Sequence, residues 1–175
     1  MGDIESKMVW CIKKDRGISL IEPSENLSTS YLAKAREALE VMRTLDGKSS
    51  SWTMTSCYYC MYYSVYAVLM RIGIKSEIHS CTQVLIRFVL DDFFDSKDAD
   101  MVSDAFEERI DNQYYTAAST NTEKQKALLG GAVNLYEKTQ RSLARMTEAN
   151  IQQKRKKVLD LITMVERKRR RGKRQ

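Results

Sequence analysis

Apolar residues recur at helical spacing along most of the chain. Between residues 27 and 45 they follow one another every three or four positions, with acidic and basic residues on the opposite face, which predicts an amphipathic helix. Residues 4–12 show the same pattern over a shorter length and end before Gly17, which can close a helix in the left-handed conformation. Residues 18–26 are expected to be extended, because the residue before Pro23 avoids the helical region.

The most apolar part of the chain is Trp52–Ile72, which is apolar or aromatic on nearly every side. Such a helix is typically enclosed by other helices or by a partner subunit. Further helices are expected to begin between residues 76 and 80, to cover 101–110, and to begin near Thr122, with the last one continuing as far as Val165. The Gly130-Gly131 pair inside that last segment weakens a helix and predicts a kink or a close helix contact.

These patterns define the fold class. Strand-like alternation is scarce and the chain contains one proline, so we predict an all-α protein: an antiparallel, up-and-down bundle of about five helices with a basic C-terminal helical extension. A length of 175 residues suits one folded domain with an extension. The expected parts are a short helix and extended lead-in at 1–22, the bundle at 23–146, and a helical or disordered basic tail at 147–175.

Charge is concentrated at the C-terminal end. The chain carries a net charge of +6, but residues 154–175 contain eleven Lys or Arg and two acids, so this end carries +9 and the rest −3. Lys and Arg release counterions when they neutralise phosphates, which makes the tail a candidate nucleic-acid contact; a solvated end or a docking site for an acidic partner is the alternative. The candidate residues are Lys168, Arg169, Arg170, Arg171, Lys173 and Arg174.

The sequence favours a cytoplasmic protein without a membrane segment. No apolar run approaches the roughly 20 residues that span a bilayer, and the polar start MGDIESK lacks the basic and apolar segments of a secretory signal.

Neither a metal nor a cofactor is expected. Cys57 and Cys60 form a C-x-x-C motif, which is used in redox and zinc sites. They lie inside an apolar helical pattern, however, and are predicted to pack as small hydrophobic residues. Histidine occurs once, which is too few for the usual zinc hydrolase sites.

Five tyrosines lie within the apolar segment, namely Tyr58, Tyr59, Tyr62, Tyr63 and Tyr66. Aromatic side chains can form a platform on which nucleic-acid bases stack. They can equally fill a core or a dimer interface with their hydroxyls at its edge.

Three separate stretches resemble one family. The first, SCYYCMYYSVYAVLMRIGIKSEIHS, resembles the signature segment of HEPN domains, in which a helix with Y-Y-x-M-[FY]-[YH] precedes a K-G-I-type loop and a histidine that opens the next helix. Residues 21–42 are similar to the first-helix region of archaeal and bacterial members. The stretch RIDNQYY resembles the later R-x-x-x-[DN]-Y element, where Arg109 and Tyr114 match and Gln113 replaces the usual acidic residue.

This resemblance, over about residues 18–140, implies an antiparallel helical bundle that commonly forms a homodimer through its central helices. Members of the family bind or cleave RNA, and many small ones are encoded beside a minimal nucleotidyltransferase as a toxin and antitoxin pair. The candidate binding residues are Tyr59, Tyr62, Tyr63, Arg109 and Tyr114.

The resemblance also indicates where a catalytic site would lie. Metal-free RNA cleavage needs groups that move protons and a cation for the developing phosphorane charge, roles that suit histidine and arginine. His79 matches the family histidine, although a histidine at a helix start can equally serve as a cap or packing residue. Active members follow R-x(4 to 6)-H, whereas seven residues separate Arg71 from His79 here. Lys75 and Arg87 are the other candidate cations.

Two functions therefore stay open. The first is a dimeric HEPN protein with a degenerate ribonuclease site that binds RNA, a nucleotide or a nucleotidyltransferase partner in a toxin–antitoxin-like module; the missing arginine before His79 favours it. The alternative is a metal-independent endoribonuclease that uses His79 with a nearby Arg or Lys, and the retained histidine favours that. The sequence does not decide whether the protein is an enzyme.

Overall fold

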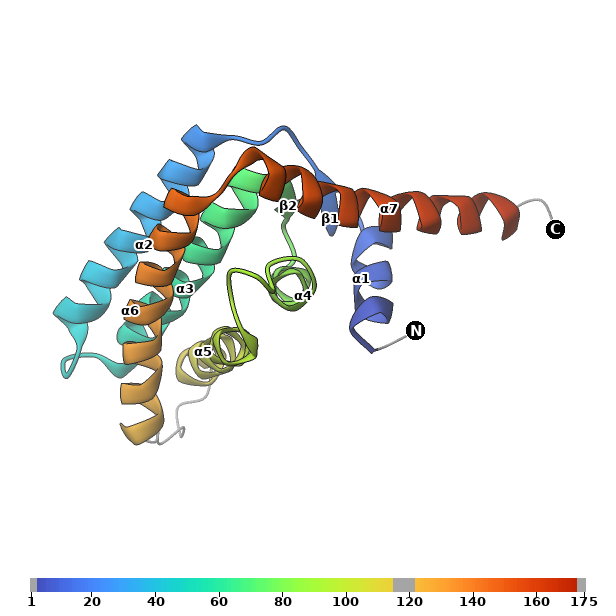
Figure 1. The fold of residues 1–175 in the computed structure, drawn as a ribbon. Coiled ribbons are helices and arrows are strands. Elements are labelled where there is room, and N and C mark those ends of the chain that lie inside the picture. Colours follow the sequence, from blue (N-terminus) through green and yellow to red (C-terminus); the bar gives the residue numbers. More distant parts are fainter. Residues whose placement is uncertain (1–2, 115–121, 173–175) are drawn as a thin grey trace.

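The computed structural model describes residues 3–114 and 122–172, which form seven helices and one two-stranded sheet (Figure 1). The elements are α1 (Asp3–Lys13), β1 (Ile18–Leu20), α2 (Glu25–Leu45), α3 (Ser50–Ile72), β2 (Ile74–Ser76), α4 (His79–Phe88), α5 (Ser96–Tyr114), α6 (Thr122–Arg145) and α7 (Glu148–Gly172). The predicted all-α class is confirmed. None of the described helices is long and apolar enough to cross a bilayer.

The helix α3 forms the centre of the fold. The helices α2 and α6 run beside it and α5 crosses it, so α3 is packed on most of its sides (Figure 1). Most of its residues are buried, including Tyr58 and Met61. The apolar pattern around the whole helix follows from this enclosure by other helices of the same chain.

Local sequence explains how the flanking helices begin and pack. The Ser24 hydroxyl accepts a hydrogen bond from the Leu27 amide at 3.2 Å and caps the start of α2. In α6 the glycine pair does not end the helix. A Cβ at Gly131 would lie 2.3 Å from the sulfur of Met101 on α5, so glycine here permits the close helix contact that was one of the two expectations.

The extended N-terminal segment pairs with the loop that follows α3. Ile18 is opposite Ser76 and Leu20 is opposite Ile74 in an antiparallel pair. An extended conformation was predicted for the first strand, but its partner was not. The pairing holds β2 in place immediately before α4 and so fixes where that helix begins.

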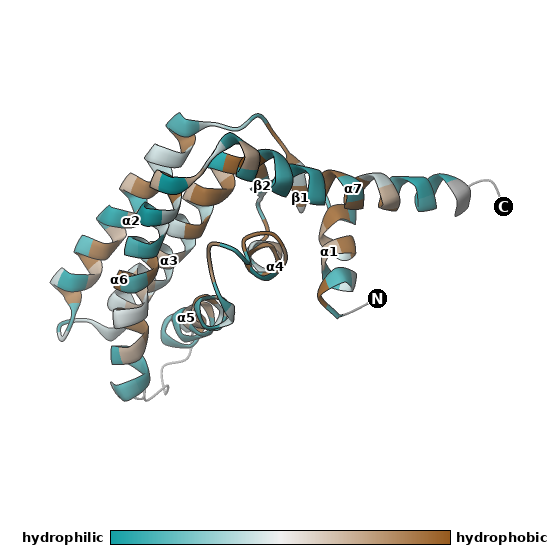
Figure 2. Cartoon of the chain, viewed as in Figure 1, coloured by the Kyte–Doolittle hydropathy of each residue, from teal (hydrophilic) through white to brown (hydrophobic). Residues whose placement is uncertain are grey.

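The last two helices are separate. The chain bends at residues 146 and 147, where the Thr147 amide donates to the Asn150 side chain at 2.9 Å and the Asn150 amide donates to the Thr147 hydroxyl at 3.3 Å. This reciprocal cap starts α7. From there α7 passes β1 and α1 and extends beyond the bundle, with a largely hydrophilic surface at its far end (Figures 1 and 2).

Arg155 of α7 forms hydrogen bonds to the bundle. Arg155 donates through Nη1 to the backbone oxygens of Ile21 at 2.6 Å, Ile72 at 3.1 Å and Gly73 at 3.0 Å. These three carbonyls belong to the lead-in to α2 and to the end of α3. A single guanidinium therefore connects three segments that are far apart in sequence.

Candidate functional site

His79 is the first residue of α4, and its ring lies against side chains from two other helices. Its centroid is 5.8 Å from that of Tyr58 and 4.8 Å from that of Tyr62, both on α3. On α5 the ring of Phe106 stacks on it at 5.6 Å. The imidazole is half-buried in an aromatic surrounding where α3, α4 and α5 meet.

A hydrogen bond determines which ring nitrogen of His79 carries the proton. The Tyr58 hydroxyl lies 2.5 Å from His79 Nδ1. Burial raises the pKa of Tyr58, so the phenol keeps its proton, and within the described residues the hydroxyl has no other acceptor. Because a buried hydroxyl normally donates, we assign Tyr58 as the donor and Nδ1 as the acceptor. In the neutral ring the proton is then on Nε2.

The surroundings also keep this ring neutral. Burial, followed by the positive charge of Arg109, holds the pKa of His79 below its ordinary value of 6.5. Both effects penalise the imidazolium. Near neutral pH His79 therefore presents a hydrogen-bond donor, Nε2–H, without a full charge.

Arg109, on α5, supplies the cation of the site. Its guanidinium carbon lies 5.4 Å from the ring centroids of both Tyr58 and Tyr59, within cation–π distance. No carboxylate among the described residues pairs with it, and its buried Nε has no hydrogen-bond partner there. We call His79, Arg109, Tyr59 and Tyr62 the His79 site.

The His79 site presents hydrogen-bond donors and a positive charge. A neutral imidazole N–H is a donor, and so is a guanidinium that pairs with no carboxylate of the described residues; Arg is well suited to phosphate oxygens. The rings of Tyr59 and Tyr62 are half-buried. Tyr59 stacks on Tyr63 and Tyr62 on Tyr66, so a base could contact only the part of each ring that stays exposed. The site thus combines two donors of a kind that phosphate oxygens accept from with partly exposed aromatic rings.

The structure shows the position of Arg71 and an ion-pair partner of Lys75, two of the predicted catalytic cations. Arg71 comes nine residues after Tyr62 on α3, so it lies on the opposite face and about 13 Å further along the axis. Lys75, on β2, forms an ion pair with Glu77 at 2.6 Å.

Arg87 lies in the last turn of α4, about 12 Å along the axis from His79. It forms an ion pair with Asp100 of α5 at 2.6 Å. The cation that does lie beside His79 is Arg109, which the sequence had assigned to binding. The sequence pattern points to the loop before His79 and to α4 for this cation, whereas the side chain comes from α5.

The remaining binding candidates are distributed along two helices. Tyr63 stacks on Tyr59 with 5.4 Å between centroids, and Lys34 of α2 lies 5.7 Å from the Tyr63 ring. These contacts continue the aromatic surface along α3. Tyr114 lies at the end of α5 and is 72 % exposed.

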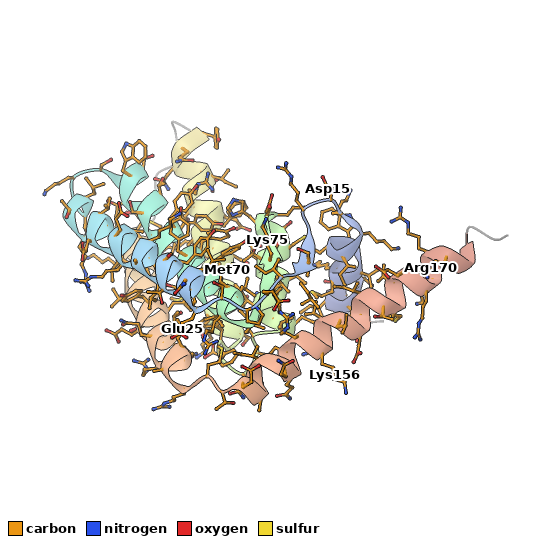
Figure 3. The ribbon with its side chains drawn as sticks, turned by 90° about the horizontal axis from the view of Figure 1, so that it is seen from above. Asp15, Glu25, Met70, Lys75, Lys156 and Arg170 are labelled. Carbon is orange, nitrogen blue, oxygen red and sulfur yellow. A yellow bond between two sulfur atoms is a disulfide. The ribbon has the colours of Figure 1, made fainter. Side chains whose placement is uncertain are left out.

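The basic tail lies at the far end of α7. Lys168, Arg169 and Arg170 are exposed, and Figure 3 shows Arg170 well away from Met70 and Glu25 of the bundle. Arg171 belongs to the same helix. Lys173 and Arg174 lie outside the described residues.

The C-x-x-C cysteines are buried against α6. The thiol of Cys57 donates to the Leu128 oxygen at 3.4 Å and that of Cys60 to the Ala132 oxygen at 3.8 Å. Burial raises the pKa of both thiols to about 12, which leaves them unreactive. Within residues 3–114 and 122–172 no group of three or more His, Cys, Asp or Glu side chains is arranged to hold a metal ion.

The other two cysteines form a disulfide that the sequence did not reveal. Cys11 of α1 is bonded to Cys81 of α4. Because Cys81 is two residues after His79, this bond fixes α1 against the helix that carries the histidine.

Comparison with protein families decides the classification. The family model of the HEPN domain matches residues 28–142. The chain belongs to the HEPN domain family. The matched range runs from α2 to α6 and contains the whole His79 site, while α1, β1 and α7 lie outside it. A comparison with curated proteins finds no match.

Proposed function

We propose that this HEPN protein binds single-stranded RNA at the His79 site. A phosphate would accept hydrogen bonds from His79 Nε2–H and from Arg109, and an adjacent base would stack on Tyr59 or Tyr62. The observation that carries the proposal is the Arg109 guanidinium, which has no carboxylate partner among the described residues and lies beside a histidine held neutral. A half-buried cation of this kind is best satisfied by an anionic ligand.

The end of α7 would add affinity without sequence preference. Lys168, Arg169 and Arg170 form an exposed basic end that can neutralise several phosphates. Each phosphate contact releases counterions, so this part of the binding should weaken steeply as salt is raised.

The hydrogen bond from Tyr58 favours binding over cleavage. A general base must accept a proton, but the nitrogen that Tyr58 leaves free on His79 already carries one. Metal-independent endoribonuclease activity is the second candidate. It is favoured by Arg109, which supplies beside His79 the cation that the preceding loop lacks.

Two predictions concern partners. We infer from family membership that the protein acts as a homodimer in the cytoplasm, and that its partner in a toxin–antitoxin-like module is a minimal nucleotidyltransferase. Light scattering of the purified protein, alone and with a candidate nucleotidyltransferase, tests both.

The first experiment measures RNA affinity in EDTA by fluorescence anisotropy with a labelled single-stranded oligonucleotide. Arg109→Gln should weaken binding by about tenfold or more, since a hydrogen bond to a charged group contributes about 1.5 to 3 kcal/mol. The matched control is Arg141→Gln, which removes the same charge from an exposed position on α6. Equal affinities for the two variants would show that the His79 site does not bind RNA.

The second experiment separates the two candidate functions. Wild-type protein and His79→Ala are incubated with mixed cellular RNA in EDTA. Cleavage that disappears in His79→Ala would establish a ribonuclease. Binding without cleavage would support the binding module.

A further inference from the structure

A cavity of about 490 Å³ lies between α1, α4 and α5. Its lining residues include Lys7 and Trp10 of α1, Ser80, Gln83 and Arg87 of α4, and Ser103 of α5. Ligand sites commonly have volumes of about 300 to 1,000 Å³. The cavity is therefore large enough for a small molecule or for one unit of a polymer.

The cavity adjoins the His79 site along the pair of helices α4 and α5. These helices run antiparallel, since His79 stacks on Phe106 at one end and Arg87 pairs with Asp100 at the other. Ser103, which lines the cavity, precedes Phe106 by three residues, or about 4.5 Å along the axis. A strand with a phosphate at His79 would thus bring its next nucleotide to the cavity.

The walls carry the groups that recognise a base. The indole of Trp10 is 48 % exposed, and Lys14 lies 5.0 Å from its ring centroid. An exposed indole offers a face for stacking, which is tolerant of base identity. The Gln83 amide can both donate to and accept from a base edge, and the hydroxyls of Ser80 and Ser103 can do the same.

Charge at the cavity favours a base over a polyphosphate. Lys7 is paired with Asp3 at 2.8 Å and Arg87 with Asp100 at 2.6 Å. Both cations are paired with carboxylates, so these two offer little positive charge to a triphosphate, and Lys14 lies over the Trp10 ring instead. An uncharged aromatic ring with polar edges suits the walls better.

We propose that this Trp10 cavity is a nucleobase subsite, which holds the base next to the phosphate bound at the His79 site. The proposal rests on the proposed function and extends it beyond the residues that match the family, because Trp10 and the rest of α1 precede residue 28. The Cys11–Cys81 disulfide holds the α1 wall against α4. RNA recognition then involves α3, α4 and α5 of the family domain together with α1, which the domain does not include.

The two tryptophans of the chain make the test specific. Trp52→Phe leaves Trp10 as the only tryptophan, and Trp10→Phe leaves Trp52, which is 62 % exposed in the first turn of α3. Each variant is titrated with AMP and with a six-nucleotide single-stranded RNA while tryptophan emission is recorded. Both ligands should quench the emission of Trp10. Neither should quench the emission of Trp52 more than it quenches free indole in solution.

An affinity measurement accompanies the emission titrations. Trp10→Ala should weaken binding of the labelled RNA by about tenfold, as expected for the loss of one stacked base. Trp52→Ala should leave the affinity unchanged. Circular dichroism of both variants confirms that they are folded.

The outcomes separate this inference from the proposed function. If RNA binds and depends on Arg109 but Trp10 is not quenched, the cavity is not a base subsite and the proposed function stands. If AMP quenches Trp10 while RNA affinity is indifferent to Arg109→Gln, the cavity binds nucleotides and the proposed function is wrong. If RNA does not bind and AMP does not quench Trp10, both are wrong.

Discussion

Replacing Gly73 by alanine should destabilise this protein more than replacing any other glycine of similar conformation. Gly73 ends α3 with φ 78°, in the left-handed region. A Cβ there would lie 2.3 Å from Nη1 of Arg155, 2.5 Å from the Ile21 oxygen and 2.7 Å from the Pro23 nitrogen. Two of these three atoms belong to the backbone, so the junction between α2, α3 and α7 would have to move.

The size of the effect follows from two contributions. Left-handed backbone costs an L-residue about 1 to 2 kcal/mol. Displacement of Arg155 would weaken its three hydrogen bonds to carbonyl oxygens, and such bonds with a charged donor contribute about 1.5 to 3 kcal/mol each. With partial loss of these bonds, we expect Gly73→Ala to lower the free energy of unfolding by about 3 to 5 kcal/mol.

Gly47 provides the matched control. It has φ 71°, but nothing lies within 4 Å of a Cβ built on it. Gly47→Ala therefore measures the conformational cost alone, about 1 to 2 kcal/mol.

Urea denaturation followed by circular dichroism at 222 nm gives the free energy of unfolding for both variants. A chain of this size shifts its Tm by about 2 to 4 °C per kcal/mol, so thermal scans provide a second reading. If Gly73→Ala is no less stable than Gly47→Ala, the crowding at the Arg155 junction has been misjudged.

Three further predictions concern stability. Ser24→Ala should lower the free energy of unfolding by about 1 kcal/mol in urea titrations, because it removes the cap of α2; an unchanged midpoint would contradict that role. The pKa of His79 is lowered in the folded state, so the unfolded chain takes up a proton first as pH falls below about 6.5, and stability should decrease there and recover above it. His79→Gln should lose this component of the pH dependence, as measured by Tm between pH 5 and 8. The Cys11–Cys81 disulfide joins residues 70 positions apart, so reductant should lower stability by about 4 kcal/mol on the chain-entropy estimate; a Cys11→Ser, Cys81→Ser variant should not respond to reductant.

The sequence by itself was sufficient for the helical class and for most of the helices, although it predicted α6 and α7 as one continuous helix. Hydrophobic periodicity is a property of neighbouring residues, so the pattern between 27 and 45 predicted α2, and the apolar residues around Trp52–Ile72 predicted the enclosed helix α3. The family resemblance depended on motifs of the same local kind. Both the class of fold and the family were accessible because each rests on residues a few positions apart.

The start of α7 also has a local signal in the sequence. Thr147 and Asn150 form the reciprocal cap that begins α7. A Thr followed three residues later by a polar side chain is a helix start, and it would have separated α7 from α6.

The sequence named His79, Arg109, Tyr59 and Tyr62 as separate candidates, and tertiary structure alone decided that they lie together. Arg109 lies beside His79 because α5 packs against α3 and α4, and no spacing along the chain expresses that contact. The same holds for the bond between Cys11 and Cys81, and for the Trp10 cavity, which exists only where α1 meets α4 and α5. Local patterns determine which helices form, whereas the packing between helices determines which side chains act together.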